Sequence, residues 1–281
     1  MSRPEDRTVD RNVAVITGAS SGIGAATARA FAARGWRVVL AARRAEMLEE
    51  VAARCRADGA PDALPVATNV AIREQVDGLV AAAVARFGRV DVMINNAGHG
   101  VHARVHETTD ERMREIMDVN FYGVFYGCRA VAPVMIQQGG GHIFNVSSVI
   151  GKRGCPFNGA YSATKFAVCG LSDAMRVEMI PYGVRVTTVC PGLTRTDFFD
   201  RVRGGTSLNK TSFARVRGLT PPETVARRIV RTVGRNKPEI VFSLGGKLLV
   251  WVHNRWPRLA DRMMKLYHDD LIRAKERGGG C

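Results

Sequence analysis

The chain has 281 residues, 46% hydrophobic and 24% charged, which is ordinary for a folded globular protein and allows one large buried core. A formal net charge of +15 favours an anionic partner: a phosphate-bearing cofactor, an anionic membrane surface or nucleic acid. Because the arginines are scattered and no nucleic-acid-binding motif accompanies them, we do not expect nucleic acid as a partner.

Short apolar runs rich in β-branched residues alternate with helical segments along the chain. We expect strands at residues 12–17, 37–42, 63–68, 90–96, 142–148, 184–190 and 239–243. Continuous apolar strands separated by helices indicate a parallel sheet covered on both faces. The expected fold is therefore α/β: a single-domain Rossmann fold over residues 1–245, with a doubly wound seven-stranded parallel sheet. Ligands should bind at the carboxyl ends of its strands.

A glycine-rich turn, TGASSGIG, follows the first expected strand directly and precedes a helix. Small residues at such a turn let the backbone approach a pyrophosphate, and the amides at the helix N-terminus meet its charge. The turn therefore predicts a dinucleotide site. Its expected contacts are Gly18, Ser20, Ser21, Gly22, Ile23 and Gly24.

The second strand ends in LAARR, where an acidic residue would bond both ribose hydroxyls of NAD. The chain has Ala42 at that place and then Arg43 and Arg44. A guanidinium pairs bidentately with a phosphate, and no carboxylate is present here to repel one. This favours NADP(H) over NAD(H), although both arginines are also compatible with being solvated surface charges.

Several polar side chains follow in the later part of the chain: Asn120 inside a long helical stretch, Ser147 and Ser148 at a strand end, and Tyr161 with Lys165 four residues later. A mid-helix Asn that is buried needs partners for its amide. The Tyr-x-x-x-Lys spacing alone is compatible with an ordinary exposed helix face. The order in which these residues occur carries more information than any one of them.

These landmarks, with NNAG at 95–98 and PGLTRT at 191–196, resemble in kind and order the motifs of the short-chain dehydrogenase/reductase family. The resemblance runs from about residue 11 to 243 and implies a catalytic set of Asn120, Ser148, Tyr161 and Lys165. The spacing to Tyr161 favours Ser148 over Ser147. The resemblance also implies homodimers or homotetramers. Further implied cofactor contacts are Asn69, Val70, Asn96, Ala97, Gly98, Tyr161, Lys165, Pro191, Gly192, Leu193, Thr194 and Thr196.

The chemistry of the side chains agrees with those roles. A phenol has a pKa of about 10, and a lysine one helical turn away favours the phenolate. Tyr161 is then a general acid for carbonyl reduction and a general base for alcohol oxidation, while Ser148 stabilises charge on the substrate oxygen. The resemblance implies that Lys165 binds the nicotinamide ribose and that Asn120 holds a water. Asn69 stands where the family often has an aspartate, so the adenine contact should differ in detail.

The expected activity is hydride transfer between NADP(H) and a secondary alcohol, ketone or aldehyde. Two other functions stay open: a non-catalytic nucleotide-binding sensor or scaffold on the same fold, and an epimerase or lyase that keeps its nicotinamide bound. His99, Ser148, Cys155 and Phe157 are candidates for the substrate pocket. The irregular segment 193–220 suits a substrate-binding loop or lid over the strand ends, formed by a mobile loop or by short helices. We expect no metal site, although His99, His102 and His106 lie close together in sequence.

The six cysteines show no C-x-x-C pair or metal-ligand spacing, and the polar N-terminus has no apolar core of a signal peptide. A cytoplasmic protein with reduced thiols is the simplest interpretation. Residues 246–281 form a basic, amphipathic C-terminal extension. Segment 246–277 is compatible with peripheral membrane contact, which would suit a lipophilic substrate, and equally with packing on its own domain or at a subunit contact.

Overall fold

The computed structural model describes residues 12–196, 219–242 and 244–278. Its centre is a parallel sheet of seven strands in the order β3-β2-β1-β4-β5-β6-β7, which confirms the predicted doubly wound sheet. The strands are β1 (Val13–Thr17), β2 (Arg37–Ala42), β3 (Ala63–Ala67), β4 (Val92–Asn95), β5 (Gly141–Val146), β6 (Val184–Cys190) and β7 (Glu239–Val241).

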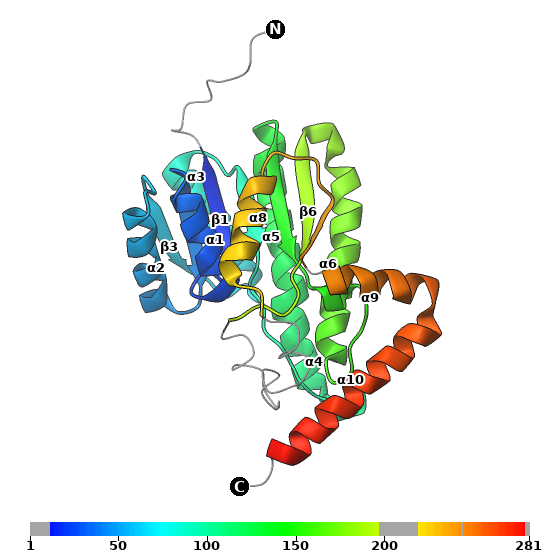
Figure 1. Cartoon of the computed structure of the whole chain (residues 1–281). Coiled ribbons are helices and arrows are strands. Elements are labelled where there is room, and N and C mark those ends of the chain that lie inside the picture. The colour runs from blue at the N-terminus through cyan, green and yellow to red at the C-terminus, as the bar shows by residue number, and fades with distance from the viewer. Residues whose placement is uncertain (1–11, 197–218, 243, 279–281) are drawn as a thin grey trace.

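Helices connect the strands and cover both faces of the sheet (Figure 1). The α-helices of the described residues, including the last two, which follow the last strand, are α1 (Gly22–Ala32), α2 (Ala45–Ala57), α3 (Arg73–Phe87), α4 (Asp110–Met117), α5 (Gly123–Gln137), α6 (Gly159–Glu178), α8 (Pro222–Thr232), α9 (Leu244–Arg255) and α10 (Pro257–Gly278). A π-helical turn, η3 (Asp118–Tyr122), joins α4 to α5, and short 3₁₀ turns are η2 (Val105–Glu107), η4 (Val149–Gly151) and η5 (Ile180–Tyr182).

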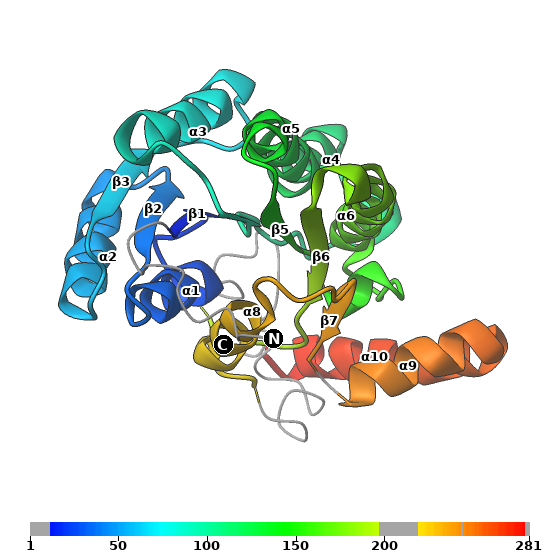
Figure 2. The ribbon, with the colours of Figure 1, turned by 90° about the horizontal axis from the view of Figure 1, so that it is seen from above.

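The core has two halves, one on each face of the sheet. Successive side chains of a strand point to opposite faces, so Ala14 and Ile16 of β1 pack in one half while Val13 and Val15 pack in the other. Helices α1, α2 and α8 cover the first face, and α3, α5 and α6 cover the second, as seen from above in Figure 2. This two-sided burial explains why the strands read as continuous apolar runs.

The strand order places β1 beside β4, although two strands and three helices separate them in the chain. The connections leaving these two strands therefore run in opposite directions across the sheet. In open parallel sheets a crevice forms at such a switch point, at the carboxyl ends of the strands. The candidate cofactor loop after β1 and the NNAG segment after β4 both lie at this edge.

The long helical stretch expected at 109–138 is present as α4, η3 and α5. By length and composition alone, Asp110–Gln137 is apolar enough to cross a bilayer. In this structure it contacts α3, β4 and α6, and buries Ile116, Asn120 and Val131 against the rest of the chain. The stretch is therefore part of the core of this fold.

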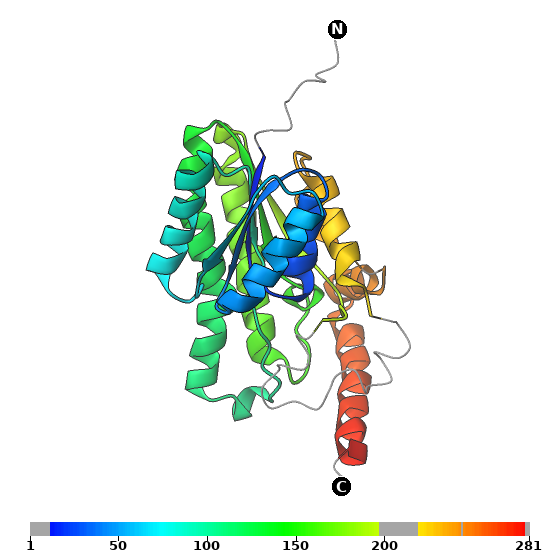
Figure 3. The ribbon, with the colours of Figure 1, turned by 90° about the vertical axis from the view of Figure 1, so that its left-hand side faces the viewer.

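Helices α9 and α10 follow β7 and lie outside the two helical layers (Figure 2). The chain turns between them at Trp256 and Pro257, and α10 then extends on the side toward which the strands point (Figures 1 and 3). The division between a domain ending at 245 and an extension stays a prediction. Most of the irregular segment 193–220 lies outside the described residues, apart from a parallel bridge between Thr194 and Thr220.

The contact between α5 and β4 requires a residue without a side chain. A Cβ added at Gly127 would lie 2.0 Å from Oδ1 of Asn95, whereas one added at Gly78 in α3 would meet nothing within 4 Å. We predict that Gly127→Ala lowers the free energy of unfolding by about 2 kcal/mol or more. Gly78→Ala should raise it by about 0.5–1 kcal/mol. Urea titrations followed by circular dichroism measure both, and a neutral Gly127→Ala would contradict the packing.

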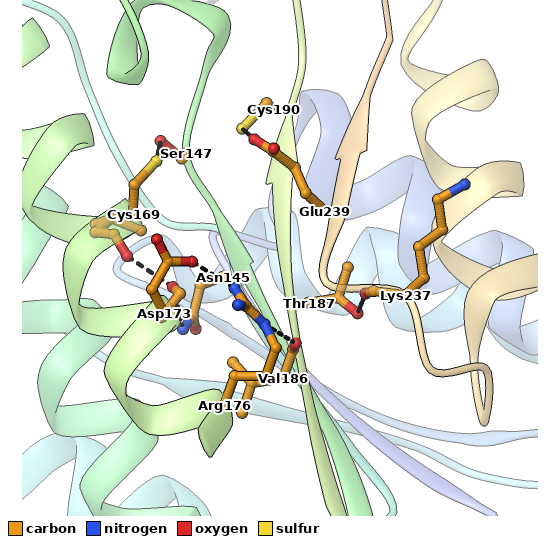
Figure 4. Close-up of polar contacts among 12 residues, drawn as sticks. Asn145, Ser147, Cys169, Asp173, Arg176, Val186, Thr187, Cys190, Lys237 and Glu239 are labelled. Atoms are coloured by element: carbon orange, nitrogen blue, oxygen red, sulfur yellow. Dashed lines mark hydrogen bonds and ion pairs between the residues drawn. The ribbon is translucent and has the colours of Figure 1, made fainter. Parts of the chain in front are cut away.

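His142, buried in β5, is held as a neutral ring between two strands and a turn. The Gly234 amide donates to its Nδ1 at 3.2 Å, so the proton sits on Nε2, which donates to Oγ1 of Thr187 at 2.8 Å. Thr187 in turn donates to the Lys237 carbonyl at 2.6 Å, a contact visible in Figure 4. Burial lowers the pKa of His142 to about 3.

This lowered pKa makes stability depend on pH. An unfolded histidine has a pKa of about 6.5, so as the pH falls from there toward 3 the unfolded chain binds the proton first. The contribution of His142 is therefore complete above about pH 6.5 and decreases below it. We predict that His142→Gln is less stable than wild type at pH 7. The difference in the free energy of unfolding between the variant and wild type should narrow by roughly 1 kcal/mol per pH unit on acidification.

Urea titrations from neutral to acidic pH check this prediction. His106, whose side chain is 77% exposed, supplies the control: His106→Gln should parallel wild type at every pH. A His142→Gln curve that also stays parallel to wild type would show that His142 is protonated in the folded state as easily as in the unfolded one.

Candidate active site

The glycine loop between β1 and α1 folds tightly against the segment after β4. Gly18 has φ +65°, a conformation that side chains disfavour, and a Cβ there would lie 2.8 Å from the Ala97 Cα. A Cβ at Gly24 would lie 2.2 Å from the Gly18 carbonyl oxygen. The glycines thus keep the turn narrow and leave its backbone open to a ligand.

Thr17 and Asn96 join the glycine loop to the end of β4. The Thr17 hydroxyl accepts from the amides of Asn96 and Ala97 at 2.9 and 3.1 Å, and donates to the Ile94 carbonyl at 3.3 Å. The Asn96 side-chain amide donates to the Thr17 carbonyl at 2.9 Å. Asn96 and Ala97, expected to contact the cofactor, therefore also hold its loop in position. Thr17 belongs with them, although the glycine motif alone did not assign it a role.

The two arginines after β2 are both exposed at the same edge. Nη2 of Arg44 donates to the Ser20 hydroxyl in the glycine loop at 3.1 Å, so this guanidinium stands directly over the loop. Asn69, after β3, uses its Oδ1 to accept from the Ala71 amide at 3.2 Å, and the neighbouring Val70 is buried near Gly123 of α5. The structure thus brings the ends of β1 and β2 together around one turn.

The segment after β6 lies next to the start of α1, at the same edge of the sheet. A Cβ at Gly22 would lie 3.1 Å from Cγ2 of Thr196, so the start of α1 and the segment after β6 are neighbours. The Leu193 carbonyl accepts from the Thr220 amide at 2.9 Å, and the buried Thr194 donates to the Gly192 carbonyl at 3.1 Å. These bonds fix the backbone from Gly192 to Thr196, where the nicotinamide half of a dinucleotide is expected.

Two serines at the end of β5 have different surroundings. Ser147 is buried, donates to the Lys165 carbonyl at 2.9 Å and lies 3.3 Å from Sγ of Cys169 (Figure 4). Ser148 is half-buried, and its hydroxyl donates to the Pro191 carbonyl and accepts from the Ile150 amide, both at 3.4 Å. The long contacts leave the Ser148 hydroxyl able to turn toward a ligand, whereas Ser147 is part of the packing.

Tyr161 and Lys165 occupy successive turns of α6, and Nζ of Lys165 lies 5.6 Å from the centre of the Tyr161 ring. Lys165 is 3% exposed and donates to the Val146 carbonyl at 2.9 Å. Burial lowers the pKa of Lys165 to about 8. Burial raises the pKa of Tyr161 above its usual range, and a hydrogen bond with Ser148 acts in the opposite direction. Burial thus acts on the pKa values of the phenol and the amine in opposite directions.

Asn120 is fully buried in the π-helical turn η3, a distortion that often marks a functional position. Its Oδ1 accepts from the His99 amide and its Nδ2 donates to the His99 carbonyl, both at 2.9 Å. Nδ2 also lies 3.3 Å from Oγ1 of Thr164. A Cβ at Gly98 would lie 3.0 Å from Oδ1 of Asn120 and 3.6 Å from Nζ of Lys165. Asn120 therefore ties the loop after β4 to α6 beside the lysine.

Of the candidate pocket residues, Ser148, Cys155 and Phe157 lie between β5 and α6, whereas His99 lies in the loop after β4. Cys155 is half-buried, and burial raises the pKa of its thiol to about 11. Phe157 has φ +60°, and its ring stacks between His102 at 5.3 Å and His268 of α10 at 5.2 Å. The contact with His268 was not predicted, because nothing in the local sequence relates α10 to this segment. Among the described residues, no three His, Cys, Asp or Glu side chains gather as they would around a metal.

Buried side-chain hydrogen bonds also join β4, β5 and α6 near the candidate site. Nδ2 of Asn95 donates to Oδ1 of Asn145 at 2.8 Å, and Nδ2 of Asn145 donates to the Ser172 hydroxyl at 3.0 Å. The two asparagines are register partners on β4 and β5. An Asn near the end of each of two apolar strands was the available sequence signal, but their pairing depends on the strand order.

The residues present fit a dinucleotide. Helix α1 has no acidic residue in its first turn, and Ser21 makes no side-chain cap, so the first amides are available to an anion. The narrow turn at Gly18 lets a pyrophosphate approach these donors, and Arg44 adds positive charge at the Ser20 end. Gly18 to Gly24, with Arg43 and Arg44, would hold the adenosine and phosphate half. Lys165 and the segment from Pro191 to Thr196 would hold the other half.

Comparison with known proteins agrees with this arrangement. A family model described as short chain dehydrogenase matches residues 12–206. The Dehydrogenase/reductase SDR family protein 7-like of Drosophila melanogaster is 34% identical over 265 residues, covering 90% of this chain and 81% of that protein.

Solved structures are similar over most of their length. An alcohol dehydrogenase of Thermococcus sibiricus complexed with 5-hydroxy-NADP is 30% identical with a TM-score of 0.73, and the match covers 83% of this chain and 96% of that one. A short chain dehydrogenase/reductase of Burkholderia phymatum in complex with NAD is 29% identical with a TM-score of 0.80, covering 89% and 95%. The predicted resemblance is confirmed: the chain belongs to the short-chain dehydrogenase/reductase family, oxidoreductases that act on CH–OH groups with NAD(P).

Proposed function

We propose that the chain is an NADP(H)-dependent oxidoreductase that interconverts a secondary alcohol and a ketone or aldehyde, with Tyr161 as general acid and base. The observation that carries this proposal is the meeting of three side chains at the carboxyl edge of the sheet. Tyr161 hydrogen-bonds with Ser148 and lies 5.6 Å, ring centre to Nζ, from Lys165. The glycine loop lies at the same edge, across the switch point between β1 and β4.

Each side chain has a separate role in carbonyl reduction. The Tyr161 hydroxyl gives its proton to the carbonyl oxygen, and in alcohol oxidation the phenolate takes that proton back. Ser148 donates a hydrogen bond to the same oxygen and stabilises the charge that develops on it. A bound nicotinamide supplies the hydride to the carbonyl carbon, or accepts it in the reverse direction.

Lys165 and Asn120 support the proton transfer. Burial raises the pKa of Tyr161, and the hydrogen bond with Ser148 lowers it. A charged Lys165 would favour the phenolate further. With a pKa of about 8, Lys165 is mostly charged at neutral pH. Asn120 lies beside Nζ of Lys165 near Gly98. A water held there would return protons from solvent to the lysine.

The preference for NADP(H) rests on Arg43 and Arg44. Both are exposed at the edge where the adenosine ribose is expected, and Arg44 lies over the glycine loop through Ser20. Ala42, Arg43 and Arg44 put no carboxylate at the end of β2, and a guanidinium there can pair with a 2′-phosphate. Of the similar solved structures, one is complexed with 5-hydroxy-NADP and another with NAD. In this chain the two arginines are the feature that favours NADP(H).

We further propose a small lipophilic carbonyl or alcohol as substrate, because the half-buried Cys155 and Phe157 stand in the segment just before Tyr161 and offer apolar surface. Homodimers or homotetramers follow from the family, in which oligomers are common. The five described cysteines are free thiols, which supports a cytoplasmic location.

Two other functions make different predictions for NADPH. A nucleotide-binding sensor or scaffold would bind NADPH and consume none with any carbonyl. An epimerase or lyase that keeps its nicotinamide bound would convert substrate without net NADPH oxidation. Absorbance of NADPH followed against a panel of ketones and aldehydes separates both from the proposed reductase.

Tyr161→Phe removes the transferred proton and keeps the ring. We predict that kcat falls at least about 100-fold, while NADPH still binds with a Kd near the wild-type value. Steady-state kinetics and fluorescence titration of NADPH measure the two quantities. Tyr182→Phe is the matched control, since Tyr182 lies in η5 and is 46% exposed, and it should retain wild-type rates. A Tyr161→Phe enzyme with near-native kcat would remove Tyr161 from the chemistry.

Arg43→Ala tests the cofactor preference. Loss of a charge-assisted hydrogen bond to the 2′-phosphate should raise the Kd for NADPH by roughly tenfold or more and leave the Kd for NADH unchanged. Arg54→Ala, an equal change of charge on the exposed face of α2, should affect neither cofactor. If Arg43→Ala weakened both cofactors equally, the assignment to the 2′-phosphate would be wrong.

A further inference from the structure

Helices α9 and α10 carry large apolar side chains that the rest of the described chain does not cover. Their exposed fractions run from 38% to 69%. Single exposed apolar residues are ordinary, whereas a contiguous group of them marks an interaction surface. We call this set the apolar stripe: Leu248, Trp251, Trp256, Leu259, Met263 and Leu266.

The sequence of α10 arranges its faces in a repeated order. Three triplets in α10 repeat the same order of residues: a basic residue, an exposed apolar residue and an apolar residue that faces the protein. They are RLA at 258–260, RMM at 262–264 and KLY at 265–267. Successive residues of a helix are about 100° apart, and the triplets recur at helical spacing. Three parallel stripes result: one packed on the protein, the apolar stripe beside it, and an exposed basic stripe beyond.

The tryptophans extend the apolar stripe from α10 to α9. The rings of Trp251 and Trp256 meet edge to face with centroids 5.1 Å apart, and the guanidinium of Arg255 lies 5.8 Å from the Trp256 ring. Tryptophan beside a cation is typical of the boundary between water and hydrocarbon, because the indole is apolar with one polar N–H.

The opposite side of α10 is fixed to the body of the protein, so the exposure does not come from a detached helix. Asp261 pairs with Arg153 at 2.5 Å, and His268 stacks on Phe157. Ala260 and Met264 are buried beneath. Arg153 and Phe157 both lie in the segment that leads to Tyr161, so α10 lies at the same edge of the molecule as the candidate active site, the end toward which the strands point (Figure 3).

We propose that the apolar stripe and the adjoining basic stripe dock this protein on an anionic lipid surface. The apolar side chains would enter the headgroup boundary, and Arg258, Arg262 and Lys265 would face lipid phosphates. Lys265 also pairs with Asp269 at 2.8 Å, which leaves the two arginines as the stronger contributors. Anionic lipid is favoured over a second copy because a second copy carries the same formal net charge of +15, whereas lipid phosphates complement it.

The test measures binding of the full chain to lipid vesicles by co-sedimentation. Wild type should bind vesicles of phosphatidylcholine and phosphatidylglycerol, and bind neutral phosphatidylcholine vesicles more weakly. Leu266→Glu should weaken binding by roughly tenfold or more. The double variant Arg258→Gln/Arg262→Gln should lose roughly fivefold per charge and be less sensitive to salt. Val177→Glu is the matched control, since Val177 is 65% exposed on α6 and Leu266 is 69% exposed.

Thermal unfolding of each variant shows that the fold is retained, because both glutamates replace exposed side chains. Absence of vesicle binding by wild type would overturn the proposal, as would equal losses in Leu266→Glu and Val177→Glu. Sedimentation velocity adds a third outcome. A dimer that Leu266→Glu converts to monomer would show that a second copy covers the stripe, and this too would overturn the proposal. None of these outcomes bears on the proposed reductase activity.

Discussion

The buried amino group of Lys165 is the constraint on which the arrangement of the site depends. An ammonium removed from water is stable only with polar partners, and Lys165, 3% exposed, donates to the Val146 carbonyl at the end of β5. The backbone carbonyl of Lys165 accepts a hydrogen bond from the hydroxyl of Ser147, the residue that follows Val146. Helix α6 is thereby bound to the end of β5 at two points. This fixes the rotation of α6, and with it the direction in which Tyr161 presents its hydroxyl.

The remaining polar contacts extend that anchor across the sheet. Asn120 joins α6, through Thr164, to the loop after β4, and Asn96 joins the same loop to Thr17 and the glycine turn. Hydrogen bonds at the two ends of the loop after β4 therefore connect the candidate proton-transfer residues to the candidate cofactor loop. A site built in this way holds its geometry through rigid elements and supporting contacts, which efficient proton and hydride transfer requires.

Much of the fold could be predicted from the sequence, since a buried parallel strand is a run of apolar β-branched residues and each run is followed by a helix. The catalytic candidates could be identified because the motifs that contain them occur in the same order as in the short-chain dehydrogenase/reductase family. The boundaries were less exact: the expected strand 90–96 ends at Asn95, because Asn96 turns away to bind Thr17. The π-helical turn at Asn120 and the pairing of Asn95 with Asn145 arise from packing between distant segments, so local patterns could not predict them. The stack of His268 on Phe157 is a further case.

The most direct test of the central claim follows the transferred atom. The enzyme is incubated with a carbonyl substrate from the panel and NADPH carrying deuterium at the transferable position of its nicotinamide, and the product is analysed by mass spectrometry. Net reduction by a nicotinamide predicts an alcohol with one deuterium on the carbinol carbon and an equal amount of NADP⁺. If every carbonyl in a broad panel were recovered unreduced, with NADPH bound but not consumed, the account of this chain as a reductase would be contradicted.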